Sequence, residues 1–265
     1  MLSFNTLGRR GRLGNQMFQY AALFSIARRV GTDFCIPRSV GADQWRDHQL
    51  LRVFALPQLK FLGAPRGFPR LGETSFVHDP DIHLGCPPDA DLDGFFQSER
   101  YFAEFADEIR REFRFRPDTE DFCRREIARS GGEAISLHVR RGDYVDSGGN
   151  HPPCPVGYYE EALRRLPGAP PVLVFSDDPQ WCRSQPLFQG GRWRIVEGNP
   201  NHVDMCLMSL CIHHVIANSS FSWWGAWLGW NRDKIVVAPD RWFGETGYTA
   251  GHDTRDLLPE PWIRI

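Results

Sequence analysis

The segment AISLHVRRGDY, residues 134–144, determines how the second half of the chain is interpreted. Its first six residues are mostly apolar, and a short apolar run of this length is typical of a buried strand. Arg140, Arg141, Gly142 and Asp143 follow directly, where that strand would end. Because parallel sheets bind ligands at the carboxyl ends of their strands, this turn is the first candidate for a functional site.

Apolar strands and helical segments continue to alternate as far as residue 238. Strands are predicted at 134–139, 171–175, 193–196, 214–217 and 234–238, and helices at 157–166, 203–212 and 221–230. The apolar side chains of residues 203–212 recur at helical spacing. Strands that alternate with helices in this way predict a parallel α/β sheet.

The first half of the chain is less regular. Strands are predicted at 1–5 and 92–96 and helices at 15–29 and 99–113, whereas the turn-rich residues 41–72 allow no assignment. Gly131 and Gly132 offer a junction between the two halves. We therefore predict two domains, 1–131 and 132–265, which suits a chain of 265 residues.

The composition excludes several classes of protein. Hydrophobic residues make up 42% of the chain and the formal net charge is −2, so neither disorder nor nucleic-acid binding is expected. The cysteines are scattered without a CxxC pair, which predicts reduced thiols and no zinc site. The N-terminus has no signal segment, and no apolar run approaches the roughly 18 residues that a membrane helix needs.

Three predicted strand ends carry side chains suited to an anionic ligand. Arg140 and Arg141 offer planar guanidinium groups that donate paired hydrogen bonds to phosphate. Ser219 and Ser220 precede a predicted helix, whose N-terminal N–H groups favour an anion. Asp177 follows another strand and can accept hydrogen bonds from guanine or a ribose. The structural alternatives are an Arg–Asp pair for the arginines and ordinary helix capping for the other residues.

Two acidic clusters resemble metal sites, HDPDIH at 78–83 and DADLD at 89–93. The second is similar to the DxD motif that holds a divalent ion on nucleotide sugars in some enzymes. Prolines flank both clusters and neither ends a strand of the regular half, so solvated loops are the preferred interpretation and no metal is expected. A P-loop is also absent from the sequence, because neither lysine follows a glycine.

Several motifs together resemble the family 11 α-1,2-fucosyltransferases. They are GRLGNQMFQYAA (11–22), GFFQSERYF (94–102), HVRRGDYV (138–145), CPVGYYEEAL (154–163), FSDDP (175–179) and DMCLMSLCIHHVIANSSFSWWGAWL (204–228). They occur in the order of the family and span nearly the whole chain. The resemblance implies a GT-B fold, in which two Rossmann-like α/β domains face each other across a cleft. Residues 1–131 would form the acceptor side and residues 132–265 would bind GDP-fucose.

The resemblance also implies roles for single residues in an inverting reaction that needs neither a metal ion nor another cofactor. Arg140 would grip the β-phosphate. Asp143 is the candidate base on other grounds, because it lies three residues after Arg140, just past the predicted strand end. Pairing of Asp143 with Arg141 or Arg12 is the structural alternative, and His151 is an alternative base. The donor-binding residues would be Gly14, Asn15, His138, Arg141, Asp177, Ser219 and Ser220.

Within that donor site, the resemblance assigns each group a part of the nucleotide. His138 and Asp177 would lie near the guanosine, and Ser219 and Ser220 near the diphosphate. Asn15 would face the cleft from the other domain, together with the preceding glycine. The expected partners are therefore GDP-fucose and an oligosaccharide that contains galactose.

Two alternatives stay open at this point. One is a fucosyltransferase with another linkage, such as the α-1,6 enzymes, and the other is a glycan-binding protein that stacks sugars on tryptophan. Trp223, Trp224, Trp227 and Trp230 are expected in the core, which argues against the second alternative. Animal relatives carry a membrane anchor that does not occur here, which predicts a bacterial enzyme of the cytoplasm or the inner membrane face, in peripheral contact with membrane-linked glycans.

Overall fold

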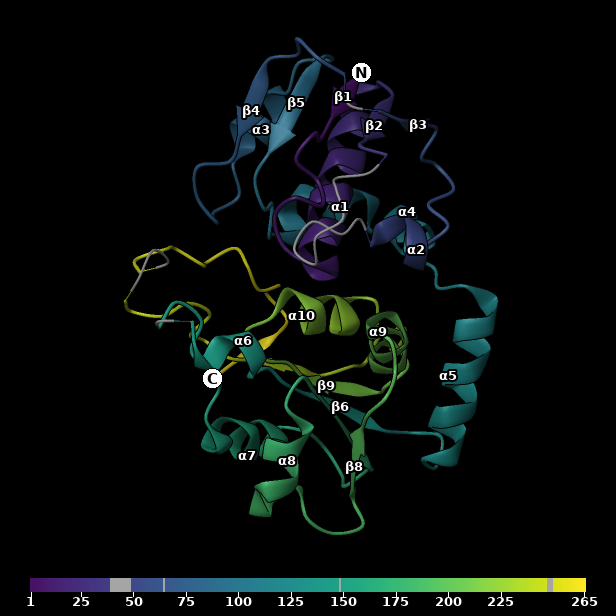
Figure 1. Cartoon of the computed structure of the whole chain (residues 1–265), viewed down its shortest axis with the longest axis vertical. Coiled ribbons are helices and arrows are strands. Elements are labelled where there is room, and N and C mark those ends of the chain that lie inside the picture. Colours follow the sequence, from purple (N-terminus) through teal and green to yellow (C-terminus); the bar gives the residue numbers. More distant parts are fainter. Residues whose placement is uncertain (39–48, 64, 148, 247–249) are drawn as a thin grey trace. The chain divides into compact units, whose positions relative to one another are not determined.

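The computed structural model describes residues 1–38, 49–63, 65–147, 149–246 and 250–265. Part of the unassigned stretch 41–72 therefore lies outside the described residues. The chain forms two compact units: Met1–Arg116 with Asp253–Pro259, and Pro117–His252 with Glu260–Ile265. Both are α/β units built on parallel sheets (Figure 1), as the sequence predicts. Among the described residues, no helix combines the length and apolarity needed to cross a membrane.

The first unit is built around a parallel sheet whose strand order is β3-β2-β1-β5-β4. Its strands are β1 (Leu2–Ser3), β2 (Phe34–Ile36), β3 (Phe61–Leu62), β4 (Arg70–Gly72) and β5 (Ala90–Asp93). Its helices are α1 (Leu13–Val30), α2 (Leu50–Val53), α3 (Pro80–Gly85) and α4 (Ala106–Glu112), with the 3-10 turns η1 (Glu99–Tyr101) and η2 (Ala103–Phe105). Strands β1 and β5 are neighbours, with β2 and β3 on one side of them and β4 on the other. The loops that follow β1 and β5 therefore lie next to each other at the edge of the sheet.

Helix α1 forms the centre of this unit and confirms the helix predicted at 15–29. Its apolar residues surround it on nearly every side, and almost all of its length is buried. The helix ends at Gly31, whose φ of 73° lets its N–H donate back to Arg28 O at 3.3 Å. Tyr20 Oη donates to Glu112 Oε2 at 2.6 Å and thereby joins α1 to α4.

The second unit contains a parallel sheet of order β8-β7-β6-β9-β10-β11. Its strands are β6 (Ile135–Val139), β7 (Val172–Ser176), β8 (Trp193–Val196), β9 (His213–Val215), β10 (Val236–Ala238) and β11 (Ile263–Arg264). Its helices are α5 (Pro117–Arg129), α6 (Gly142–Val145), α7 (Val156–Arg164), α8 (Pro179–Ser184), α9 (Asn201–Ser209) and α10 (Ser220–Trp227), with the 3-10 turn η3 (Pro186–Phe188). If the six strands of this unit are numbered from 1 to 6 along the chain, their order in the sheet is 3-2-1-4-5-6. This is the strand order of a dinucleotide-binding Rossmann sheet.

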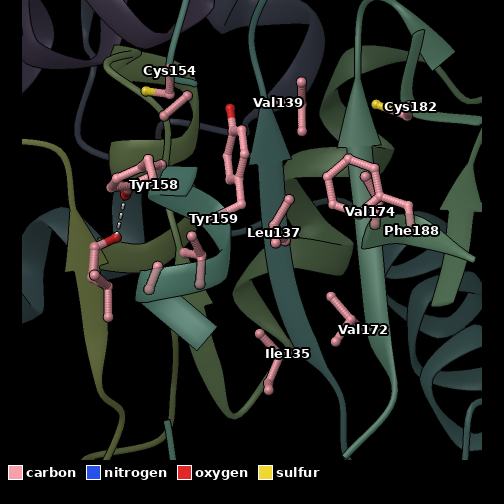
Figure 2. Packing of buried hydrophobic residues seen from close by; sticks show 14 of the residues in the cluster. Ile135, Leu137, Val139, Cys154, Tyr158, Tyr159, Val172, Val174, Cys182 and Phe188 are labelled. Carbon is pink, nitrogen blue, oxygen red and sulfur yellow. Dashed lines mark hydrogen bonds between the residues drawn. The ribbon is translucent and has the colours of Figure 1, made fainter. Parts of the chain in front are cut away.

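The core of the second unit lies between this sheet and the helices beside it. Figure 2 shows Leu137 and Val139 of β6 beside Val174 of β7, with Tyr159 of α7 packed against them. All four side chains are completely buried. Strand β6 is buried along its whole length, and its apolar residues alternate with Ser136 and His138, whose side chains find hydrogen-bond partners in the interior.

The compact units divide at Arg116, and not at the boundary predicted near residue 131. Helix α5 belongs to the second unit because its buried face packs on α9. The Cys123 thiol lies 3.6 Å from Val203 O, and Glu126 pairs with Arg194 of β8. The glycines at 131 and 132 form the turn between α5 and β6 within one unit.

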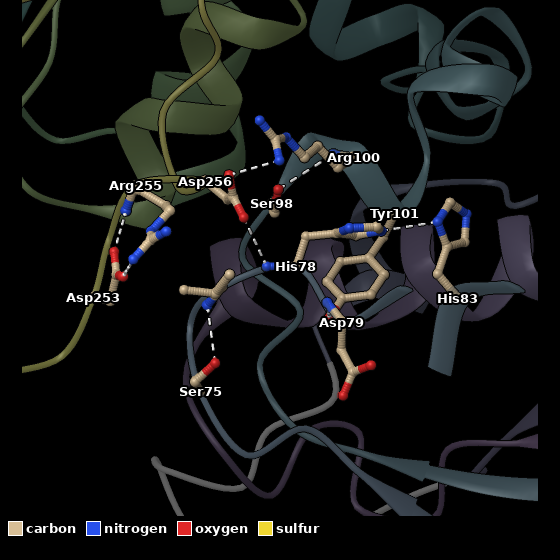
Figure 3. Close-up of polar contacts among 11 residues, drawn as sticks. Ser75, His78, Asp79, His83, Ser98, Arg100, Tyr101, Asp253, Arg255 and Asp256 are labelled. Atoms are coloured by element: carbon tan, nitrogen blue, oxygen red, sulfur yellow. Dashed lines mark hydrogen bonds and ion pairs between the residues drawn. The ribbon is translucent and has the colours of Figure 1, made fainter. Parts of the chain in front are cut away.

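A C-terminal segment returns to the first unit, although residues 132–265 were predicted as one domain. Asp256 anchors it: the carboxylate accepts the His78 N–H at 3.1 Å and pairs with Arg100 at 2.9 Å (Figure 3). The side chain of Asp256 is almost fully buried in these contacts. A buried carboxylate with two partners fixes the segment Asp253–Pro259 on the first unit.

The tryptophans of α10 and its surroundings are mostly in the core. Trp223, Trp224 and Trp227 are buried, as predicted, and pack against one another. The prediction is wrong for Trp230, which lies beyond the end of α10 and is 67% exposed. The apolar run continues past the helix, so the sequence alone did not show that the chain turns outward there.

Candidate active site

The strand order of the second unit defines where a ligand is expected. Strands β6 and β9 are neighbours, and the chain runs outward from them in opposite directions across the sheet. Such a point leaves a crevice at the carboxyl ends of the two strands. Arg140 follows β6 directly, and Asn218, Ser219 and Ser220 follow β9 at the start of α10. The polar residues predicted at separate strand ends therefore gather at one edge of the sheet.

Arg140 stands at the centre of this edge and is held from three directions. Its Nη1 lies 2.7 Å from Asp177 Oδ2, and its Nη2 donates to Asp143 Oδ1. The guanidinium carbon lies 5.1 Å from the centre of the Tyr144 ring. The side chain is only 16% exposed, so the charge of Arg140 is fixed in a partly desolvated place, where it acts more strongly than in water.

Arg141 has a different environment from its neighbour. Its Nε donates to Asp178 Oδ2 at 3.2 Å, and its guanidinium lies 4.2 Å from the centre of a ring of Trp181 on α8. Asp178 in turn caps α8 by accepting the Trp181 N–H at 3.0 Å. These contacts tie Arg141 to α8, so a role in donor binding stays a prediction for this residue. The alternative in which Asp143 pairs with Arg141 is replaced by the pair between Asp143 and Arg140.

Gly142 allows the turn after β6 to approach Asp177. A Cβ atom at position 142 would lie 2.5 Å from Asp177 Oδ2. Asp177 Oδ1 accepts the Arg141 backbone N–H at 2.9 Å, so both carboxylate oxygens are engaged by the same turn. Asp177 thus fixes the turn and the guanidinium of Arg140 together.

His138 connects the two strands of the crevice. Its Nδ1 lies 2.9 Å from the hydroxyl of Ser222 on α10. That hydroxyl has one proton to donate and lies within 3.5 Å of two backbone carbonyls of its own turn. We therefore assign the Nδ1 proton to His138, which leaves Nε2 as an acceptor. Burial, reinforced by the charge of Arg140, lowers the pKa of His138 to about 3, so the ring is neutral near pH 7.

Asn218 joins the loops beside the crevice, a role that sequence reasoning missed. Its Nδ2 donates to Pro152 O and to Trp242 O, each at 3.0 Å, and its own carbonyl accepts from Tyr144 Oη at 3.0 Å. The residue is almost completely buried. Its position inside the ANSSFSWWG motif, next to Ser219, was the available signal.

Tyr144 and His151 form a stack beside Arg140. Their ring centres lie 5.0 Å apart with an interplanar angle of 20°, and Phe243 packs near His151 at 5.4 Å. Burial lowers the pKa of His151, while the charge of Asp143 opposes the shift. His151 Nδ1 is buried, and the described part of the chain supplies it no hydrogen-bond partner. Asp143 is more open to solvent, with 40% of its side chain exposed.

The first unit contributes a separate set of polar groups at its own sheet reversal. Gly14 and Asn15 lie at the start of α1, and Asn15 Oδ1 accepts from Gln97 Nε2 at 3.0 Å. Gln97 follows β5, so this bond joins the loops after β1 and β5. Gln97 was not predicted as a site residue, although it lies in the GFFQSERYF motif.

The DADLD cluster forms the strand β5, so its interpretation as a solvated loop was wrong. Asp91 Oδ1 accepts from Ser3 Oγ and from the Asn5 N–H, both at 2.9 Å. Asp93 pairs with Arg70, and hydrogen bonds and cationic neighbours lower its pKa against the opposing effect of burial. These carboxylates hold the sheet and the loop after β1.

The HDPDIH cluster forms the start of α3. Asp79 caps this helix by accepting the Asp81 N–H at 2.9 Å, and His78 Nε2 lies 2.9 Å from His83 Nδ1 (Figure 3). The Tyr101 ring packs beside His78, with the ring centres 4.7 Å apart (Figure 3). Within the described ranges, no group of three or more His, Cys, Asp or Glu side chains is arranged to hold a metal ion.

A Rossmann sheet binds nucleotides at its reversal point, and a half-buried arginine at that point suits a phosphate group. The model of the family "Glycosyl transferase family 11" matches residues 79–263. The chain belongs to this family, and the protein is therefore an enzyme, a glycosyltransferase.

Relatives with known names support this membership over nearly the whole chain. The chain is 31% identical over 290 residues to an alpha-1,2-colitosyltransferase of Escherichia coli, which covers 96% of both proteins. It is 30% identical over 277 residues to galactoside alpha-(1,2)-fucosyltransferase 2 of Oryctolagus cuniculus, which covers 97% of this chain and 73% of the relative.

Solved structures share the fold at low sequence identity. A crystal structure of NodZ alpha-1,6-fucosyltransferase soaked with GDP-fucose has a TM-score of 0.54 at 16% identity, covering 86% of this chain and 91% of NodZ. A GDP complex of POFUT1 has a TM-score of 0.57 at 11% identity, covering 89% of this chain and 97% of POFUT1. Together with the two parallel-sheet units, these similarities confirm the predicted GT-B type of α/β fold.

Proposed function

We propose that this glycosyltransferase moves L-fucose from GDP-fucose to the 2-hydroxyl of a galactoside, with inversion at the sugar carbon. One observation carries the proposal: Arg140 is fixed at the sheet reversal of the second unit, beside the turn of Ser219 and Ser220 that opens α10. A partly desolvated guanidinium and a helix N-terminus are two groups that favour a diphosphate.

In the proposed reaction the chain stabilises charge that grows on the leaving diphosphate. The bond between the sugar carbon and the β-phosphate oxygen breaks, and the oxygen leaves with the electron pair. Arg140 is positioned to donate to that phosphate, and it interacts more strongly as the negative charge develops. This arrangement supports a reaction that needs neither a metal ion nor another cofactor.

Asp143 is the proposed base. The acceptor hydroxyl loses its proton to the Asp143 carboxylate while its oxygen bonds to the sugar carbon. The exposure of Asp143 and its place beside Arg140 support this role. His151 is less suited, because its Nδ1 is buried.

The guanosine is proposed to lie near His138 and Asp177. The assigned tautomer leaves His138 Nε2 able to accept a hydrogen bond from a guanine N–H or a ribose hydroxyl. Asp177 already accepts from Arg140 and from the Arg141 backbone, but a carboxylate has lone pairs for further donors. Guanine is favoured because its N1–H and N2–H₂ groups donate side by side.

The galactoside acceptor is inferred from the relatives, and the first unit is its proposed side. The name of the rabbit relative specifies a galactoside and an α-(1,2) linkage. Asn15 and Gln97 are the polar pair that this unit offers at its sheet reversal. The α-1,6 linkage of NodZ is a weaker candidate, because that protein is similar at 16% identity only.

Transfer of colitose is a second candidate function. The relative named as an alpha-1,2-colitosyltransferase covers 96% of this chain at 31% identity. Colitose differs from L-fucose by the loss of one hydroxyl, so the same diphosphate site would serve both donors. The choice between them depends on contacts with a single hydroxyl group.

The test is to incubate the protein with GDP-fucose or GDP-colitose and a panel of galactosides and other sugars. Mass spectrometry identifies which sugar is transferred, and NMR identifies the linkage of the product. We expect a fucosylated galactoside with an α-1,2 linkage. Preferential use of GDP-colitose would favour the second candidate, and an α-1,6 product would overturn the proposed linkage.

A further inference from the structure

The two carboxylates that share Arg140 differ in exposure and in the element that carries them. Asp177 is fixed by the Arg141 N–H at 2.9 Å and by the close packing of Gly142, and 26% of its side chain is exposed. Asp143 lies on α6, a helix of only four residues, and 40% of its side chain is exposed. Asp143 is therefore the partner of Arg140 that moves at the lower cost.

The charges at this edge oppose a further anion. Arg140 and Arg141 meet the carboxylates of Asp143, Asp177 and Asp178, so these carboxylates outnumber the guanidinium groups. A diphosphate adds at least two negative charges in a place with little water, where like charges repel strongly. A phosphate oxygen at Arg140 Nη2 would also occupy the position that Asp143 Oδ1 holds in this structure.

We propose that the donor diphosphate and Asp143 exchange at Arg140. A β-phosphate oxygen takes the Nη2 donor, while Asp177 keeps Nη1 and preserves the orientation of the guanidinium. Asp143 is released with its negative charge and becomes available to accept the proton of the acceptor hydroxyl. Binding of the donor thereby prepares the base, so the donor must bind before the acceptor can react.

This inference rests on the proposed function, and the exchange conserves charge and protons. One ion pair between Arg140 and Asp143 is replaced by one between Arg140 and phosphate. No proton moves until the acceptor hydroxyl arrives, when its O–H bond breaks and Asp143 takes the proton. A carboxylate that merely orients Arg140 would instead help the phosphate to bind.

The direction in which Asp143→Asn changes the affinity for GDP distinguishes a carboxylate that exchanges with the phosphate from one that only orients Arg140. Asp143→Asn removes the competing charge, so we expect GDP to bind about three- to tenfold more tightly, in the range of a partly exposed ion pair. The same variant should transfer fucose more slowly by about 10²–10⁴ because the base is lost. Isothermal titration with GDP and a transfer assay measure the two opposite effects.

Asp146→Asn is the matched control for the general loss of negative charge. Asp146 ends the same short helix and is exposed, so its substitution should change GDP affinity less than twofold, a limit set by screening at the surface. GMP is the matched ligand, because it lacks the β-phosphate. The gain in affinity of Asp143→Asn should therefore be absent with GMP.

Two outcomes would overturn the exchange. One is GDP affinity in Asp143→Asn that is unchanged or weaker than in the unmodified protein, and the other is an equal gain in Asp146→Asn. If Asp143→Asn does not fold, as judged by thermal unfolding, Asp143→Ser serves for the same titration. A failure of the unmodified protein to bind GDP at all would instead overturn the proposed donor site itself.

Discussion

At the scale of single residues, orientation distinguishes Arg140 from the other arginines of the chain. Asp177 and Asp143 each take one arm of its guanidinium, and the Tyr144 ring lies below it. An arginine held in this way does not need to reorganise when charge develops on a ligand. The geometry of the fork, and not only its charge, should therefore matter for turnover.

Arg140→Ala should lower kcat by about 10²–10³, the usual effect of losing one preorganised donor. Arg140→Lys should restore only part of the rate, because an ammonium group cannot reproduce the two arms. Steady-state kinetics with GDP-fucose measure both effects. Arg183→Lys is the control, since Arg183 forms an exposed pair with Glu197 in the same unit. A near-normal rate for Arg140→Lys would show that only positive charge is needed.

Glu73 gives the first unit a pH-dependent stability. Its Oε2 accepts the N–H groups of Phe95 and Phe96 at 3.0 and 2.7 Å, and Phe96 has a φ of 52°. The carboxylate thus holds a strained turn just before Gln97. Burial raises the pKa of Glu73 to about 7, against the opposing effect of these hydrogen bonds and of Tyr101.

The sign of the pH effect follows from this raised pKa. The folded protein holds the Glu73 proton more tightly than the unfolded chain, whose glutamates titrate near pH 4.3. The resulting stabilisation is present at low pH and is lost as the pH rises through about 7. We expect the thermal midpoint of the unmodified protein, relative to Glu73→Gln, to be lower at about pH 8 than at about pH 5, two values on either side of the folded-state pKa. A difference that stays constant or rises over this range would contradict the assignment.

At the scale of elements, Tyr144 links the two strand ends of the proposed donor site. Its ring lies under Arg140 after β6, and its hydroxyl bonds Asn218 O, just before α10. Tyr158 of α7 makes the same kind of bond, to Ile216 O at 2.6 Å, but within the core. Tyr144 and Tyr158 therefore allow a comparison between a hydroxyl beside the site and one in the core.

Tyr144→Phe should lower kcat about three- to tenfold while leaving the thermal midpoint nearly unchanged, because the ring stays and one hydrogen bond of about 1 kcal/mol is lost. Tyr158→Phe should do the opposite, lowering the thermal midpoint more with little effect on kcat, because its hydroxyl lies against two buried carbonyls, those of Ile216 and Val237. Kinetics and thermal unfolding of both variants give the comparison. If both variants lost stability and rate to the same extent, Tyr144 would have only a structural role.

The sequence predicts elements well where their partners are local and poorly where they are distant. Strand β6 is visible because Ile135, Leu137 and Val139 place apolar side chains at alternate positions, on one face of the strand. The helix predicted at 99–113 is divided into η1, η2 and α4, since Phe102 has a φ of −140° and leaves the helical conformation. Strand β5 was predicted too late in the chain, at 92–96, because Asp91 and Asp93 find their partners far away in the sequence.

At the scale of the whole molecule, the division into units depends on such distant contacts as well. Helix α5 joins the second unit through α9, and Asp256 fixes a C-terminal segment on the first. No local sequence pattern predicts either of these two contacts. The candidate site residues of the second unit could be predicted from the sequence because most of them follow a regular strand, whereas Asn218 and Gln97 act through bonds that only the fold brings about.

The acidic clusters of the first unit lead to a prediction about metal ions. Asp91 and Asp93 bond to residues of neighbouring strands, and Asp79 caps the N-terminus of α3. We therefore expect transfer to continue in EDTA at more than about half the rate measured without it, because charge on the diphosphate is met by Arg140 and the α10 N-terminus. The transfer assay with and without EDTA checks this. A complete loss of activity that Mn²⁺ restores would contradict it.

The most direct test of the account concerns the hydroxyl that receives the sugar. The protein is incubated with GDP-fucose and a simple β-galactoside, and in parallel with the 2-deoxy analogue of the same galactoside. Mass spectrometry then measures the gain of one fucose residue on each acceptor. The account predicts fucosylation of the galactoside and none of its 2-deoxy analogue. Equal fucosylation of both acceptors would contradict transfer to the 2-hydroxyl.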